Sequence, residues 1–62
     1  MDSYEVMAEK IMESVGRAKS YLNAVKDVHC MADNLRILDR VSGEIAEIRK
    51  LYYDIQNLDD ED

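Results

Sequence analysis

The sequence contains no proline, no tryptophan and no phenylalanine, and only one of its 62 residues is a cysteine. A single cysteine, Cys30, cannot form a disulfide within the chain, and such usage is typical of a reducing compartment. The first residues, Met1-Asp2-Ser3, lack the basic start and the apolar run of a secretory signal. No segment approaches the roughly 20 apolar residues that a membrane-spanning helix needs. We therefore expect a cytoplasmic protein with no membrane partner.

Residues that carry chemistry are equally scarce. Gly16 and Gly43 stand alone, so the chain has no glycine-rich phosphate loop. His29 and Cys30 are adjacent, so their side chains would point about 100° apart on a helix and could not readily share a metal ion. One histidine and one cysteine are also too few for a zinc site, which needs about four ligands. No nucleophile, base and acid are spaced for catalysis. We expect no catalytic residue, no metal, no cofactor and no enzymatic activity; a redox or metal role for Cys30 across a dimer axis is the alternative.

The charge of the chain is concentrated at its end. The net charge is −6, and four of the fourteen acidic residues form the terminal run Asp59, Asp60, Glu61 and Asp62. Carboxylates at the end of a helix oppose its dipole, so we expect this acidic tail to fray into solvent. The tail would then keep the protein soluble, or act as a phosphate-mimicking hook for a basic partner.

Apolar residues recur at alternating spacings of three and four, which is the heptad pattern of an amphipathic helix. One series runs through Tyr4, Ala8, Ile11, Val15, Ala18, Leu22 and Val25, and a second runs through Leu38, Val41, Ile45, Ile48, Tyr52 and Ile55. Extending the first series into the second half would bury Arg36, Asp39 and Gly43. The change of phase therefore predicts that the chain reverses between two helices.

Capping residues place the ends of these helices. Asp2, followed by Glu5, is a candidate N-cap for the first helix, and Asp33 is a candidate N-cap for the second. The connection is short, so the helices should be antiparallel neighbours. The expected fold is an all-α hairpin with helices over about 3–29 and 34–58 and a turn at about 30–33. A three-helix bundle, kinked near Gly43, is the structural alternative.

The apolar stripes are wider than the seam of one hairpin can cover, which is typical of helices with neighbours on two sides. Two hairpins related by a two-fold axis would supply those neighbours, so we expect a homodimer that forms a four-helix bundle. No acidic residue is expected in the seam. The apolar residues left for the homodimer or for another protein are Met7, Met12, Tyr21, Ile37, Leu51, Tyr53 and Leu58.

These features favour a noncatalytic protein–protein interaction module: an adaptor, chaperone or inhibitor of the kind that phages and plasmids encode. The layout of two near-equal helices resembles plasmid RNA-binding bundles of the Rop type, and this resemblance implies RNA or DNA binding as an alternative. An acidic mimic that blocks a nucleic-acid-binding protein is another. The basic residues of the first half alternate with acidic ones, so we expect no nucleic-acid partner. They are Lys10, Arg17, Lys19 and Lys26.

Overall fold

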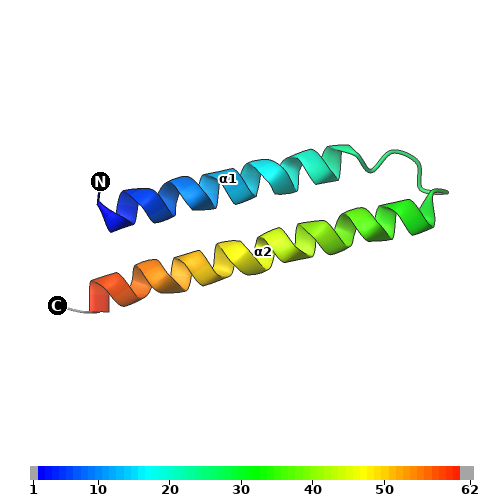
Figure 1. Cartoon of the computed structure of the whole chain (residues 1–62). Helices are drawn as coiled ribbons and strands as arrows, with labels where there is room; N and C mark the ends of the chain where they lie inside the picture. Colours follow the sequence, from blue (N-terminus) through cyan, green and yellow to red (C-terminus); the bar gives the residue numbers. More distant parts are fainter. Residues whose placement is uncertain (1, 61–62) are drawn as a thin grey trace.

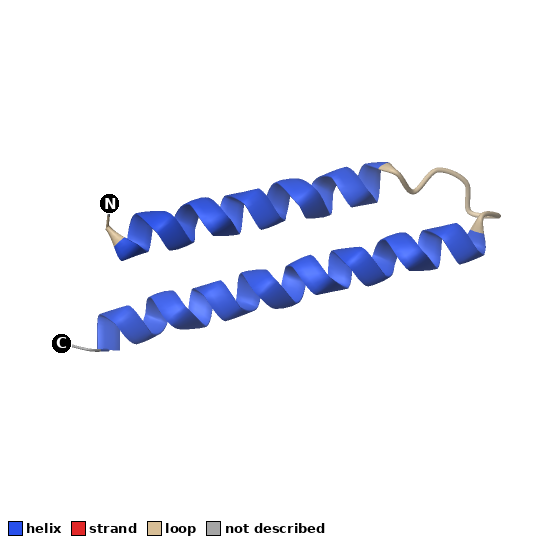
Figure 2. Cartoon of the chain, viewed as in Figure 1, coloured by secondary structure: helices blue, strands red, loops and turns tan. Residues whose placement is uncertain are grey.

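The structure is a computed structural model that describes residues 2–60, and it consists of two antiparallel helices (Figure 1). Helix α1 spans Ser3–Asn23 and helix α2 spans Met31–Asp60. Residues 24–30 form the loop between them (Figure 2). The molecule measures 52 × 18 × 10 Å, with the loop at one end of its long axis. The described part of the chain contains helices and no strand, so the expected all-α hairpin is confirmed.

Helix α1 begins at the expected cap. The backbone amide of Tyr4 donates a hydrogen bond of 3.2 Å to the carboxylate of Asp2, and the amide of Val6 donates to the Asp2 carbonyl at 3.1 Å. Glu5 lies in the first turn, where its negative charge suits the helix dipole. Asp2 therefore satisfies amide groups that have no partner within the helix.

Helix α1 ends at Asn23, six residues before the expected end. Asp27 organises the loop that follows: its carboxylate accepts from the His29 amide at 2.9 Å, and its carbonyl accepts from the Cys30 amide at 3.0 Å. The same carbonyl accepts from the side-chain amide of Asn34 at 2.8 Å. Aspartate side chains that bond to the backbone two residues later compete with helix formation, which is the physical reason for the early end.

Helix α2 begins at Met31, earlier than expected. The amide of Asn34 donates to the carbonyl of Cys30 at 2.9 Å, so the first helical hydrogen bond closes on Cys30. Asp33 is not the cap; it lies in the first turn, 3.9 Å from the guanidinium of Arg36. The backbone stays helical through Asp60, beyond the expected end at residue 58. The side chains of the acidic tail, and all of Glu61 and Asp62, lie outside the described residues.

Both glycines lie inside helices, so the three-helix alternative is not what the chain adopts. Neither Gly16 nor Gly43 has a positive φ angle, and helix α2 is continuous through the second of them. A methyl group added at either position would meet no atom within 4 Å. Neither glycine is therefore required by the backbone or by a close neighbour within the hairpin.

Replacing Gly16 or Gly43 with alanine should stabilise the protein by about 1 kcal/mol each, because alanine loses less conformational entropy in a helix. For a chain of this length, such a change raises Tm by about 4–8 °C. Thermal unfolding followed by circular dichroism measures the effect. A lower Tm in either variant would contradict this expectation. It would show that another molecule approaches the glycine so closely that a methyl group cannot fit.

The helices meet along a seam that contains Ile11, Ala18, Val41, Ile48 and Ile55, as expected, but that is rotated from the expected seam by part of a residue. Ile11, Val41 and Leu51 form its apolar core and are at most 7% exposed. The covered positions are Met7, Ile11, Ser14, Ala18 and Tyr21 in α1, and Ile37, Val41, Glu44, Ile48, Leu51, Ile55 and Leu58 in α2. Several residues expected in the seam are instead exposed, and for them the prediction is wrong: Tyr4, Leu22, Val25, Leu38, Ile45 and Tyr52.

Candidate interaction surface

A row of apolar side chains remains exposed or only partly covered along each helix. In α2 the exposed fractions are 46% for Leu38, 46% for Ile45 and 59% for Tyr52, and these residues are seven positions apart. In α1 the corresponding row, Ala8, Val15 and Leu22, also has a seven-residue spacing and is extended by Tyr4 one turn before Ala8, so each row runs nearly parallel to its helix axis. The apolar face defined by both rows consists of Tyr4, Ala8, Val15 and Leu22 in α1 and Leu38, Ile45 and Tyr52 in α2.

The two rows lie on the same side of the hairpin. In each helix the exposed row follows the covered seam residues by one position: Val15 follows Ser14, and Ile45 follows Glu44. One residue turns an α-helix by about 100°. Both helices turn in the same sense when each is followed along its own chain direction. Because the helices are antiparallel, they turn in opposite senses when viewed from one end, so a step of one residue from the seam leads to the same side of the hairpin in both (Figure 1). The hairpin is therefore apolar on one broad side.

The middle of the seam, by contrast, is polar. The buried hydroxyl of Ser14 accepts a hydrogen bond of 3.0 Å from Arg17 Nη2. Arg17 Nε donates to Glu44 Oε1 at 3.1 Å, so the guanidinium ties the two helices together. The Arg40 guanidinium lies 5.9 Å from the centre of the Tyr21 ring. Glu44 thus occupies a seam position, which corrects the expectation that the seam excludes acidic residues.

This polar cluster allows the seam to contain polar side chains. Arg17 is half exposed, so its ion pair with Glu44 contributes about 1 kcal/mol or less. Pairing nevertheless leaves no buried side-chain polar atom without a partner among the described residues. The rotation covers the more polar of two adjacent heptad rows and leaves the uninterrupted apolar row outside. The exposed row is the feature that a single hairpin cannot account for.

The contacts of Arg17 with Glu44 and of Arg40 with Tyr21 also fix how the two rows align. Successive residues of α1 pair with successively earlier residues of α2, so Val15 and Ile45 lie at about the same level. A step of seven residues forward in α1 and seven residues back in α2, or the reverse, leads to the next pair at the same height along the hairpin. The three layers of the apolar face are Ala8 with Tyr52, Val15 with Ile45, and Leu22 with Leu38.

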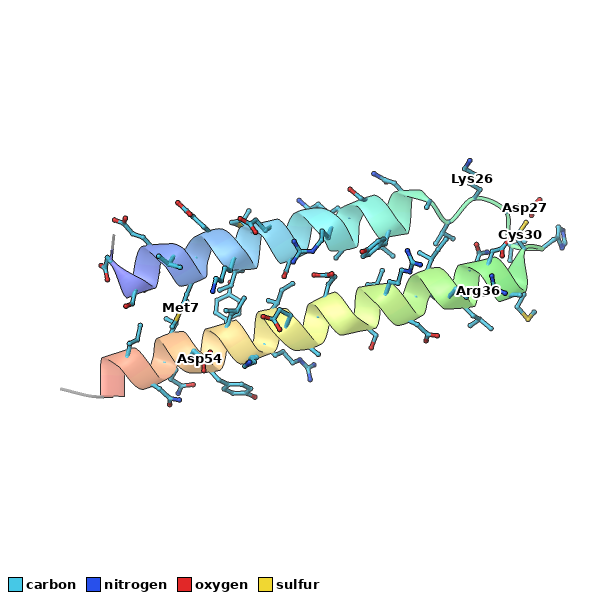
Figure 3. The ribbon with its side chains drawn as sticks, in the orientation of Figure 1. Met7, Lys26, Asp27, Cys30, Arg36 and Asp54 are labelled. Carbon is cyan, nitrogen blue, oxygen red and sulfur yellow. The ribbon has the colours of Figure 1, made fainter. Side chains whose placement is uncertain are left out.

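The residues expected to contact a partner fall into two groups. Leu51 belongs to the core at 6% exposed, and Met7 lies between the helices in Figure 3. Met12 and Tyr53 are both 64% exposed and lie outside the apolar face. The five that line the seam, and so are not left over after it is packed, are Met7, Tyr21, Ile37, Leu51 and Leu58. The sequence signal for the exposed row was present, but it was assigned to the seam.

Two shallow hollows lie on the outer surfaces, and each is formed by one helix. The hollow on α1 is lined by Ala8, Glu9, Met12 and Glu13. The hollow on α2 is lined by Ser42, Ile45, Ala46, Arg49, Lys50, Tyr53 and Asp54. Each combines apolar and charged side chains, so both suit a protein surface better than an isolated small apolar molecule.

Chemistry-bearing side chains are dispersed over the hairpin. Cys30 is exposed in the loop (Figure 3). Within residues 2–60, no three histidine, cysteine, aspartate or glutamate side chains gather where they could hold a metal ion. Lys26 lies in the loop rather than on α1, so the four basic residues of the first half do not form one helical stripe.

Neither α1 nor α2, as far as the chain is described, has the length and apolar character of a membrane-crossing helix. Comparison with known proteins found no family model, no curated protein and no solved structure that matches this chain.

Proposed function

We propose that this chain is a noncatalytic protein–protein interaction module that works as a homodimer, with the apolar faces of two hairpins packed together into a four-helix bundle. The observation that carries the proposal is the apolar face itself. Six of its seven residues form three layers on one side of the hairpin; five of the seven are exposed, and Ala8 and Val15 are partly covered. Exposed apolar patches rimmed by polar residues mark interaction sites.

The surface area of the hairpin supports this proposal. A compact protein of 7.2 kDa exposes about 4,100 Å². This hairpin exposes 5068 Å², because a pair of helices has no second layer. Two copies that assemble into a compact particle of twice the mass would bury about 3,300 Å² in total, which lies in the range of obligate homodimers.

The energetics point the same way. If about half of that buried area is apolar, the gross gain is about 40 kcal/mol at 25 cal/mol per Å². Ordering and association oppose this gain and cost a large part of it. A hairpin of this size has a small core of its own, and small domains commonly depend on disulfides, metals or self-association. We propose that self-association through the apolar face is what stabilises this chain.

The role of such a dimer is to present surfaces to a second protein, as an adaptor, chaperone or inhibitor does. Met12 and Tyr53 are both 64% exposed and lie outside the apolar face, so the dimer leaves both accessible. Exposed aromatic and methionine side chains are enriched in protein interfaces. We assign these two residues to the contact with the second protein.

Two adjacent tyrosines provide the test of this proposal. Tyr52→Ala should weaken the dimer at least tenfold, because each copy loses a large side chain from the apolar face. Tyr53→Ala should leave the dimer unchanged, and its free energy of unfolding should stay within about 0.5 kcal/mol of the parent value. Sedimentation equilibrium over a range of concentrations measures both.

The matched pair separates the proposal from a general effect of losing a tyrosine, since the two side chains are similarly exposed in the single hairpin. Equal dissociation constants for the two variants, or a larger loss for Tyr53→Ala, would refute an interface built on the apolar face.

A further inference from the structure

The two ends of the hairpin differ in charge. The half that holds the start of α1 and the end of α2, counted over residues 2–15 and 46–58, has six acidic and three basic residues, a net charge of −3. The half that holds the loop, residues 16–45, has four acidic and five basic residues, a net charge of +1. The hairpin is therefore a rod with one acidic end.

This asymmetry bears on how two copies can pack. With both loops at the same end, the two acidic halves would lie side by side and repel each other. With the loops at opposite ends, each acidic half would lie beside the slightly basic half of the other copy. The acidic ends would then be separated along a 52 Å axis, far beyond the screening length of about 10 Å at 0.1 M salt.

The layers of the apolar face give a second, independent argument. One end layer pairs the large Tyr52 with the small Ala8, and the other pairs two leucines, Leu22 and Leu38. With the loops together, one end of the interface would hold two tyrosines with two alanines, and the other would hold four leucines. With the loops apart, both end layers would hold one tyrosine, one alanine and two leucines. Protein interiors are packed to a uniform density, so layers of similar side-chain volume are favoured. The arrangement with the loops apart provides such layers.

We propose that the partner seated on the apolar face is a second copy turned end for end, so that the loops lie at opposite ends of the bundle and the Val15–Ile45 layers meet near the two-fold axis. This inference rests on the proposed homodimer and adds its orientation. In this arrangement the acidic end of each copy is next to the loop half of the other, and the two Cys30 side chains are at opposite ends.

The orientation fixes a distance that can be measured. Cys30 is fifteen residues from Ile45, which corresponds to about 22 Å along the helix axis at 1.5 Å per residue. The two Cys30 residues of an antiparallel pair are therefore about 45 Å apart. If both loops lay at the same end, the distance would be set by the width of the bundle and would stay below about 25 Å.

The experiment uses spin labels on the single, exposed cysteine and measures the distance between labels in the dimer by pulsed electron paramagnetic resonance. The control is the double variant Cys30→Ser, Ser42→Cys, because Ser42 is exposed and only three residues from Ile45. Labels at position 42 should lie within about 25 Å of each other in either orientation. The control thus reports the homodimer, and Cys30 reports its orientation.

A distance near 45 Å at Cys30 together with a short distance at Ser42→Cys is the expected result. Short distances at both positions would retain the homodimer and overturn its antiparallel orientation. No distance between labels at either position, at concentrations where the hairpin is folded, would overturn the homodimer itself.

Discussion

Ile45→Glu should convert the protein to a monomer. Ile45 lies in the central layer of the apolar face, next to the proposed two-fold axis, and the substitution places a carboxylate there in both copies. Burying an unpaired charge costs several kcal/mol, so we expect the dissociation constant to rise at least a hundredfold. Thermal stability should fall as well, because the monomer loses the stabilisation that association provides. Sedimentation equilibrium and thermal unfolding measure the two effects.

Ala46→Glu is the matched control for this prediction. Ala46 is exposed and lies about 100° further around α2 than Ile45, away from the seam, so the same charge added one residue later should stay in solvent. Its dissociation constant should remain within about threefold of the parent value, and its Tm should change little. An Ile45→Glu protein that remains a dimer under the same conditions would remove the apolar face from the interface.

Leu51→Ala should destabilise the hairpin itself by about 2–5 kcal/mol. Leu51 is 6% exposed and is one of three buried apolar residues of the seam, so truncation leaves a cavity in a core of very few residues. A domain this short has little stability to lose. We expect most of the Leu51→Ala chains to be unfolded at 37 °C, as circular dichroism and urea titration would show.

Leu35→Ala is the corresponding control on the same helix. Leu35 is more than half exposed and lies outside both the seam and the apolar face, so its loss should change stability by about 0.5 kcal/mol or less. If Leu51→Ala were as stable as Leu35→Ala, the seam described here would be wrong.

The hairpin could be predicted because the apolar pattern changes phase between residues 25 and 38, and one helix cannot keep a single apolar side through such a change. The ends of the helices were harder to place. The loop depends on hydrogen bonds from His29, Cys30 and Asn34 to Asp27, and one aspartate is as compatible with a helix end as with a turn. Capping at Asp2 was predicted because Asp2 followed by Glu5 resembles a capping box, and the Asp2 carboxylate accepts from the Tyr4 amide.

The interaction surface was only half visible in the sequence. Each helix carries two heptad rows that differ by one residue, and apolarity alone favours burying the row that contains Leu38, Ile45 and Tyr52. The seam instead uses the row with Ser14 and Glu44, and Arg17 satisfies both of these side chains. A hydrogen bond between residues 27 positions apart in the chain cannot be read from periodicity. The surplus of apolar surface was predicted, but not the residues that carry it.

The central claim is that two hairpins bury their apolar faces against each other, and the mass of the unmodified chain in solution tests it most directly. Sedimentation equilibrium at micromolar concentration should give about 14.4 kDa, twice the 7.2 kDa of one chain. A folded species of 7.2 kDa that persists as the concentration is raised would contradict the account.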